Sequence, residues 1–131
     1  MTGYTVTLIE VARLRPTEEV DAAHVETLRR EIGAEGALRL PLLIERTSLA
    51  ILDGHHRWHA AKALGLARVP VIALAYDDPR LTLSSWTSRS FEPAEVLAAA
   101  LSGRLLPRKS TRHILNPAPA PSPTPIAALA A

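Results

Sequence analysis

Residues 51–59 read ILDGHHRWH, and this stretch contains the change of pattern that decides the fold. Its first two residues close a short apolar run typical of a buried strand, which Asp53-Gly54 then interrupts. From His55 onward the apolar residues recur at helical spacing until Gly65. The stretch therefore predicts a strand that passes directly into a helix through a glycine.

Similar patterns on both sides of this junction predict the remaining elements. Short β-branched or apolar runs indicate strands at residues 5–9, 42–44, 49–52, 69–74 and 82–86. Apolar residues at helical spacing indicate helices at residues 22–34, 55–64 and 94–102. Asp21 is suited to cap the first helix, and Pro93 opens the last. The order predicts a compact α+β (α/β) domain, a small mixed sheet with packed helices.

The end of the chain has a different composition. Residues 116–131 contain five prolines, alternating mainly with small residues, and no charged residue. Proline lacks a backbone donor and fixes φ, so such a segment is a poor former of helices and sheets. We therefore predict one catalytic domain over residues 1–115 and a disordered Pro/Ala-rich tail over residues 116–131.

Composition excludes several classes of protein. Cysteine is absent, so disulfides, thiolate nucleophiles and cysteine metal sites are excluded. The N-terminal residues lack the order of a signal peptide, and no apolar run reaches the roughly 18 residues that span a bilayer. The net charge is +2, without the basic stripe of a nucleic-acid surface. We expect a cytoplasmic protein without membrane or nucleic-acid partners, and the sequence assigns no oligomeric state.

The junction also predicts an anion site. A helix N-terminus carries unpaired N–H groups and partial positive charge, Gly54 permits close approach, and Arg57 adds planar donors for phosphate. Asp53 would repel a bare phosphate, so it either binds Mg²⁺ or orients a histidine. The alternative is a polar turn that only caps the helix. Neighbouring helical side chains point in different directions, so no zinc site is expected from His55, His56 and His59.

Several segments resemble one known family. Residues 51–71, ILDGHHRWHAAKALGLARVPV, resemble the signature of ParB/sulfiredoxin-fold proteins, and the form DGHHRW resembles the free L-serine kinases of that superfamily. The further matching segments are Arg15-Pro16-Thr17-Glu18, Pro41-Leu42-Leu43, Trp86 and Lys109-Ser110-Thr111-Arg112-His113. The last of these, KSTRH, is similar to the KTTRH segment of those kinases. The resemblance spans residues 9–115, and DGHHRW together with KSTRH is a specific pair.

The resemblance implies a nucleotide-dependent kinase that converts free L-serine to O-phospho-L-serine, using ATP or ADP and Mg²⁺. It assigns Glu18 as general base, with Asp53 assisting through Mg²⁺ or by orienting a histidine. Binding of the nucleotide and its phosphates is assigned to Gly54, His55, His56 and Arg57. Binding of the amino acid is assigned to Trp86, Lys109, Ser110, Thr111, Arg112 and His113.

Alternative interpretations exist for these residues and for the whole chain. Glu18 could be a first-turn acid that only favours the helix dipole, Trp86 a core residue, and residues 109–113 a solvated basic surface. A ParB-like nucleotide-binding regulator would carry an acidic residue at position 55 and a DNA-reading domain after Leu115. A non-catalytic accessory protein would keep the anion site without needing Glu18. A sulfiredoxin-like reductase needs a cysteine and is excluded.

Overall fold

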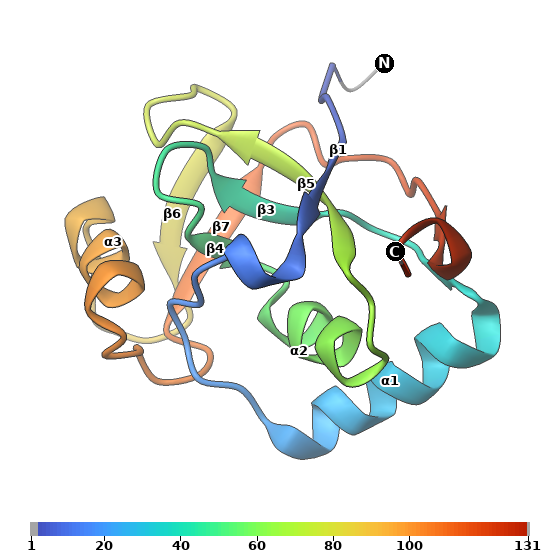
Figure 1. The fold of residues 1–131 in the computed structure, drawn as a ribbon. Helices are drawn as coiled ribbons and strands as arrows, with labels where there is room; N and C mark the ends of the chain where they lie inside the picture. Colours follow the sequence, from blue (N-terminus) through green and yellow to red (C-terminus); the bar gives the residue numbers. More distant parts are fainter. Residues whose placement is uncertain (1–2, 131) are drawn as a thin grey trace.

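A four-stranded sheet lies at the centre of the protein, as described by a computed structural model for residues 3–130 (Figure 1). Its strands, in spatial order, are β1 (Thr7–Glu10), β5 (Arg68–Leu74), β3 (Leu42–Glu45) and β4 (Ile51–Asp53). Strand β5 runs antiparallel to β1 and parallel to β3, and β3 forms an antiparallel hairpin with β4. The predicted mixed sheet is therefore confirmed.

The rest of the described chain forms two small sheets, three α-helices and two short 3₁₀ helices. In the small sheets, β6 (Leu81–Ser85) pairs with β7 (Thr111–Leu115), and β2 (Ala37–Leu38) pairs with β8 (Thr124–Pro125). The helices are α1 (Ala22–Glu35), α2 (His55–Ala63), α3 (Pro93–Ser102), η1 (Val11–Arg13) and η2 (Ile126–Ala128). Figure 1 shows α1 beside α2, while α3 lies apart from both, near β6.

The inner strands β3 and β5 of the central sheet are largely buried on both faces, which explains their continuous apolar runs. Alternate side chains of β5 point to opposite faces, so Val69 and Val71 join one core cluster and Ile72 joins the other. The first cluster includes Trp58 of α2 and Ile32 of α1, and the second includes side chains of α3. The sheet thus holds β4 and the start of α2 in a rigid frame.

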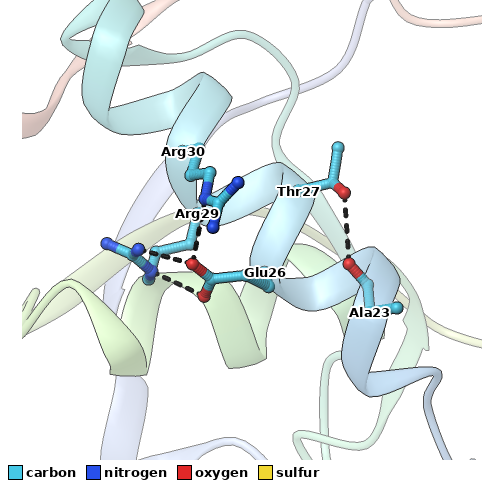
Figure 2. Close-up of polar contacts among 5 residues, drawn as sticks. All are labelled: Ala23, Glu26, Thr27, Arg29 and Arg30. Atoms are coloured by element: carbon cyan, nitrogen blue, oxygen red, sulfur yellow. Dashed lines mark hydrogen bonds and ion pairs between the residues drawn. The ribbon is translucent and has the colours of Figure 1, made fainter.

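Helix α1 begins and ends at the residues that capping rules indicate. The Asp21 carboxylate accepts a hydrogen bond from the N–H of Ala23 at 3.0 Å, and Gly36 closes the helix in the left-handed region with φ 72°. On the outer face, Glu26 pairs with Arg29 at 2.6 Å and with Arg30 at 3.1 Å (Figure 2). Such exposed pairs contribute only about 0–1 kcal/mol each, so packing against α2 determines where α1 lies.

The prediction of a disordered tail at residues 116–131 is wrong for the described residues 116–130; Ala131 lies outside them. Strand β8 pairs with β2, and Leu129 is fully buried in the first core cluster. The carbonyl of Leu129 also accepts hydrogen bonds from the N–H groups of Ala67 and Arg68. Prolines do not prevent this arrangement because few backbone donors of the segment are needed. No helix within residues 3–130 is long and apolar enough to cross a membrane.

Replacing Leu129 by alanine should lower the free energy of unfolding by about 2–5 kcal/mol, because it leaves a cavity in a closed core. Urea denaturation measures this change. The matched control is Leu101→Ala, at a side chain that is 66% exposed, where we expect a change within about 0.5 kcal/mol. Equal effects of the two substitutions would contradict the packed position of the C-terminal segment.

Candidate active site

A pocket of about 560 Å³ lies where the β4–α2 junction, the segment before α1 and strand β7 meet. Its volume falls within the range of about 300–1,000 Å³ that is usual for small-ligand sites. The residues predicted from the sequence that line it are Glu18, Asp53, Gly54, His55, His56, Arg57, Trp86, Lys109, Thr111, Arg112 and His113. The sequence interpretation missed Glu19, His24, Leu28 and Leu52, which also line it.

The junction between β4 and α2 forms one wall of this pocket. Gly54 adopts φ 102° and ψ 22°, a left-handed conformation that lets the strand turn directly into the helix. Among residues 3–130, no side chain caps the start of α2 by hydrogen bonding. Its first N–H groups and its partial positive charge therefore face the pocket as donors for an anion.

Arg57 is fixed beside this junction. Its Nη1 donates to the carbonyl oxygens of Leu40 at 2.9 Å and Pro41 at 2.8 Å, and its Nη2 lies 3.5 Å from Oδ2 of Asp53. Burial lowers the pKa of Arg57, and the nearby Asp53 opposes that effect. The guanidinium thus adds a fixed positive charge under the start of α2, while the Asp53 side chain is 65% exposed and lines the pocket.

Glu18 lies on the other side of the same pocket, with only 8% of its surface exposed. Its Oε1 accepts a hydrogen bond from the N–H of Ser110 at 2.6 Å, and its Oε2 lies 3.5 Å from Oγ1 of Thr111. Burial raises the pKa of the Glu18 carboxyl, although the hydrogen bonds from Ser110 and Thr111 lower it. A buried carboxyl with a raised pKa suits proton transfer.

The two alternatives for Glu18 and Trp86 do not fit the structure. Helix α1 begins at Ala22, so Glu18 precedes the helix and is not a first-turn acid. Trp86 is 59% exposed and forms part of the pocket wall, so it is not a core residue. The guanidinium of Arg112 stacks on its ring at 4.4 Å from the centroid.

The first two residues of the KSTRH segment precede β7 and the last three begin it. The segment lies beside the carboxylate of Glu18. Lys109, Thr111, Arg112 and His113 line the pocket. Ser110 does not: it is 3% exposed, its N–H bonds to Glu18, and its hydroxyl donates to the carbonyl of Pro107. Its position therefore assigns Ser110 to holding Glu18 in place.

The two adjacent histidines of α2 contact the segment that carries Glu18. Nε2 of His55 accepts from the N–H of Thr17 at 3.0 Å, and Nε2 of His56 accepts from the N–H of Asp21 at 3.1 Å. Burial lowers the pKa of His55 to about 3. The His56 ring stacks on His24 with the centroids 4.4 Å apart. Nothing in the sequence identified these partners, because they depend on where residues 17–24 lie against α2.

His113 contacts Tyr76, a residue that the sequence interpretation did not select. The Tyr76 hydroxyl and Nε2 of His113 are 2.7 Å apart. Burial lowers the pKa of His113 to about 4, although the backbone of Leu52 opposes this effect. The imidazole is therefore neutral at physiological pH, and it offers the pocket a polar but uncharged wall.

This pKa predicts a pH-dependent stability. The unfolded chain binds a proton at His113 near pH 6.5, whereas the folded chain does so only near pH 4. Stability is therefore highest above pH 6.5 and should fall by about 1.4 kcal/mol per pH unit between these values, from this group alone. Urea denaturation of the wild type and His113→Gln at pH 7, 6 and 5 measures the contribution. A constant difference between the two proteins across this range would contradict the assignment.

One carboxylate of the pocket lies beside the start of α2, where it could take part in holding a metal ion. Within residues 3–130, no three His, Asp or Glu side chains are grouped so that they could bind a metal ion. Mg²⁺ commonly takes one or two carboxylates together with substrate phosphates and water. The exposed carboxylate of Asp53, beside the uncapped start of α2, fits that mode of binding.

The sequence matches one family over most of its length. A profile of the ParB N-terminal domain matches residues 2–86, so the chain belongs to the ParB N-terminal domain family. This confirms the resemblance that the DGHHRW junction indicated. The matched residues include the β3–β4–α2 region together with the segment that carries Glu18.

Curated relatives include named kinases. The ATP-dependent L-serine kinase of Staphylothermus marinus is 35% identical over 83 residues, which cover 60% of this chain and 33% of that protein. The ADP-dependent L-serine kinase SerK of Thermococcus kodakarensis is 27% identical over 82 residues, covering 60% and 34%. The ParB-like protein of Sulfolobus acidocaldarius is 30% identical over 90 residues, covering 66% and 43%. The chain thus matches only about a third to less than half of each relative.

Solved structures share the whole fold. A free serine kinase in complex with AMP superimposes with a TM-score of 0.87 at 14% identity, covering 95% of this chain and 93% of that one. SbnI from Staphylococcus aureus, with a C-terminal truncation, gives 0.81 at 15% identity, covering 93% and 88%. At these identities the likeness establishes the fold, over nearly the whole chain.

Proposed function

We propose that this protein is a nucleotide-dependent kinase that phosphorylates free L-serine to O-phospho-L-serine, with Glu18 as general base. The observation that carries the proposal is the position of Glu18. Its buried carboxylate shares one pocket with the uncapped start of α2. The names of the matched relatives, which are ATP- and ADP-dependent L-serine kinases, support the same reaction.

The phosphate groups of the nucleotide would lie against the start of α2. The N–H groups after Gly54 and the charge of Arg57 would bind the phosphoryl oxygens, as helix N-termini do in other phosphate sites. ATP and ADP end in the same phosphoanhydride, so this part of the site suits either donor. When bound, Mg²⁺ neutralises charge on the phosphates, and Asp53 is the side chain that would hold it.

The amino acid would lie between the phosphate site and β7. Lys109 and Arg112 offer positive charge for its carboxylate, and the ring of Trp86 closes one side. Thr111 contributes a hydroxyl next to Glu18. A small amino acid with one hydroxyl fits these contacts, because its carboxylate and its hydroxyl each meet a complementary group.

Glu18 would remove the proton as the new bond forms. The serine hydroxyl oxygen attacks the terminal phosphorus, its proton passes to the Glu18 carboxylate, and the bond from phosphorus to the bridging oxygen breaks. The products are phosphoserine and the nucleotide shortened by one phosphate. Hydrogen bonds from Ser110 and Thr111 hold the carboxylate, and its raised pKa makes it a stronger base than an exposed glutamate.

The test is an incubation of the full chain with Mg²⁺, either ATP or ADP, and a panel of amino acids. The panel contains L-serine, D-serine, L-threonine and a serine-containing peptide. We expect mass spectrometry to detect phosphoserine from L-serine, at the highest rate in the panel. Nucleotide binding by calorimetry without any phosphorylated product would contradict the kinase and favour a non-catalytic binder. Tight DNA binding near physiological salt in a mobility-shift assay would favour a ParB-like regulator.

A further inference from the structure

The segment from Thr17 to Asp21 is held by α2 at two points, and Glu18 lies between them. At one point the N–H of Thr17 donates to Nε2 of His55, at 3.0 Å. At the other the N–H of Asp21 donates to Nε2 of His56, at 3.1 Å. Both histidines belong to the first turn of α2, which also carries the uncapped N–H groups of the phosphate site.

The donor and acceptor roles in these two contacts are fixed. A backbone N–H can only donate, so Nε2 of each ring must be an unprotonated acceptor. The hydroxyl of Thr17 donates to the carbonyl of Ile51 at 2.9 Å, and its oxygen also lies 3.2 Å from Nε2 of His55. The Nε2 lone pairs are therefore used inside the protein. Residue His55 is only 6% exposed, so its ring offers little surface to a phosphate.

A third contact completes the fixation of Glu18. From the side of β7, the N–H of Ser110 bonds to its carboxylate at 2.6 Å. The backbone of Thr17 and Glu19 also pairs with Leu106, through bonds of 2.9 and 2.8 Å. The carboxylate is thus located relative to β7 by Ser110 and relative to α2 by the two histidines.

We propose that His55 is a positioning residue, which sets the distance between the carboxylate of Glu18 and the phosphoryl group bound at the start of α2, with His56 as the second support. This inference rests on the proposed function, since Glu18 must act as base. It assigns the histidine pair a role distinct from phosphate binding. The first turn of α2 then has two functions. Its N–H groups face the phosphate, and its imidazoles hold the segment that carries the general base.

The experiment compares three variants of one residue. His55→Gln keeps an acceptor atom at similar reach, His55→Asn keeps polarity but is too short, and His55→Leu removes the acceptor. We expect kcat for serine phosphorylation to fall about a hundredfold in the Leu and Asn variants, since a displacement of about 1 Å can cost that much. The Gln variant should recover at least a tenth of the wild-type kcat. The Kd for ADP, measured by calorimetry, should change less than threefold in all three.

A double-mutant cycle with Glu18→Gln tests whether His55 acts through Glu18. We expect His55→Asn to reduce kcat no further when Glu18 is already replaced, because the two residues act as a unit. Substituting His59, a residue of α2 outside the pocket lining, by Gln is the control, and it should leave kcat and the cycle unchanged. If His55→Leu fails to fold, the Asn and Gln variants carry the comparison.

Two outcomes would overturn the inference while leaving the kinase intact. One is a cycle without coupling, in which the fold-losses in kcat from His55→Asn and Glu18→Gln multiply in the double variant. The other is a His55→Asn variant with an unchanged kcat at saturating nucleotide and a raised Kd for ADP, which would make the ring a phosphate ligand. An inactive wild type would instead refute the proposed function. In that case amide hydrogen exchange still tests the support, because His55→Asn should speed exchange in residues 17–20 and His59→Gln should not.

Discussion

Replacing Glu18 by glutamine lowers kcat for serine phosphorylation by about a hundredfold to ten-thousandfold, the usual cost of losing a general base. Glutamine has the same shape, and its amide oxygen can still accept the N–H of Ser110. The buried site is therefore preserved while the proton acceptor is lost. The Kd for the nucleotide should stay within about twofold, because the phosphate site lies on α2.

Single-turnover kinetics and calorimetry measure the two quantities separately. The matched control is Glu10→Gln, at an exposed glutamate at the end of β1, and it should leave both unchanged. A Glu18→Gln protein with full kcat would remove Glu18 from the mechanism. A protein with normal kcat but weak nucleotide binding would instead place this carboxyl in the donor site.

The second large effect is expected from Gly54→Ala. An added Cβ would lie 2.9 Å from Nη2 of Arg57 and 2.9 Å from Cγ of Leu42, and the φ of 102° is one that alanine rarely adopts. Backbone strain of about 1–2 kcal/mol and overpacking of about 1–3 kcal/mol should together lower stability by about 2–5 kcal/mol. The displaced guanidinium should also weaken nucleotide binding by about tenfold or more, the value of a charged hydrogen bond.

The variant Gly103→Ala separates the effect of backbone strain from the effect of steric overlap. Gly103 has a φ of 76°, but the space around its added Cβ is open to 4 Å. We expect this variant to lose only about 1–2 kcal/mol and to bind nucleotide normally. Urea denaturation and calorimetry on the two proteins give the comparison. Equal losses of stability in both, with unchanged affinity, would show that close packing at Gly54 is unimportant.

Local signals predicted most elements of the fold. Asp21 before α1, Pro93 at the start of α3 and Gly103 after it act within one turn of the helices they limit, so sequence spacing alone locates them. The apolar run of β5 likewise reports burial on both faces. These features depend on neighbours in the sequence, which is why they could be predicted from it.

Non-local pairing explains what was missed. The sequence predicts no strand at β7, because the strand forms by pairing with β6, which is distant in the sequence. The proline content of the C-terminal segment predicts disorder, although Ile126 and Leu129 pack on the core. These two apolar residues lie three positions apart, and that spacing is the feature of the sequence that indicates a packed segment.

For the site, the resemblance selected residues most of which meet in one pocket, while their roles stay predictions. Residue identities in DGHHRW and KSTRH predicted which side chains meet in the pocket. The roles of His55, His56 and Ser110 depend on which backbone group lies opposite each of them. That information comes from the path of residues 17–21 across α2, and spacing within a motif does not contain it.

The unequal environments of the two tryptophans have a spectroscopic consequence. Trp58 is 6% exposed and donates its indole N–H to Val11 at 3.0 Å, so its fluorescence is constant while the fold is intact. Trp86 is exposed on the pocket wall under a guanidinium, so its emission responds to whatever enters. The protein therefore contains its own optical titration probe, and occupancy of the pocket can be followed without a label.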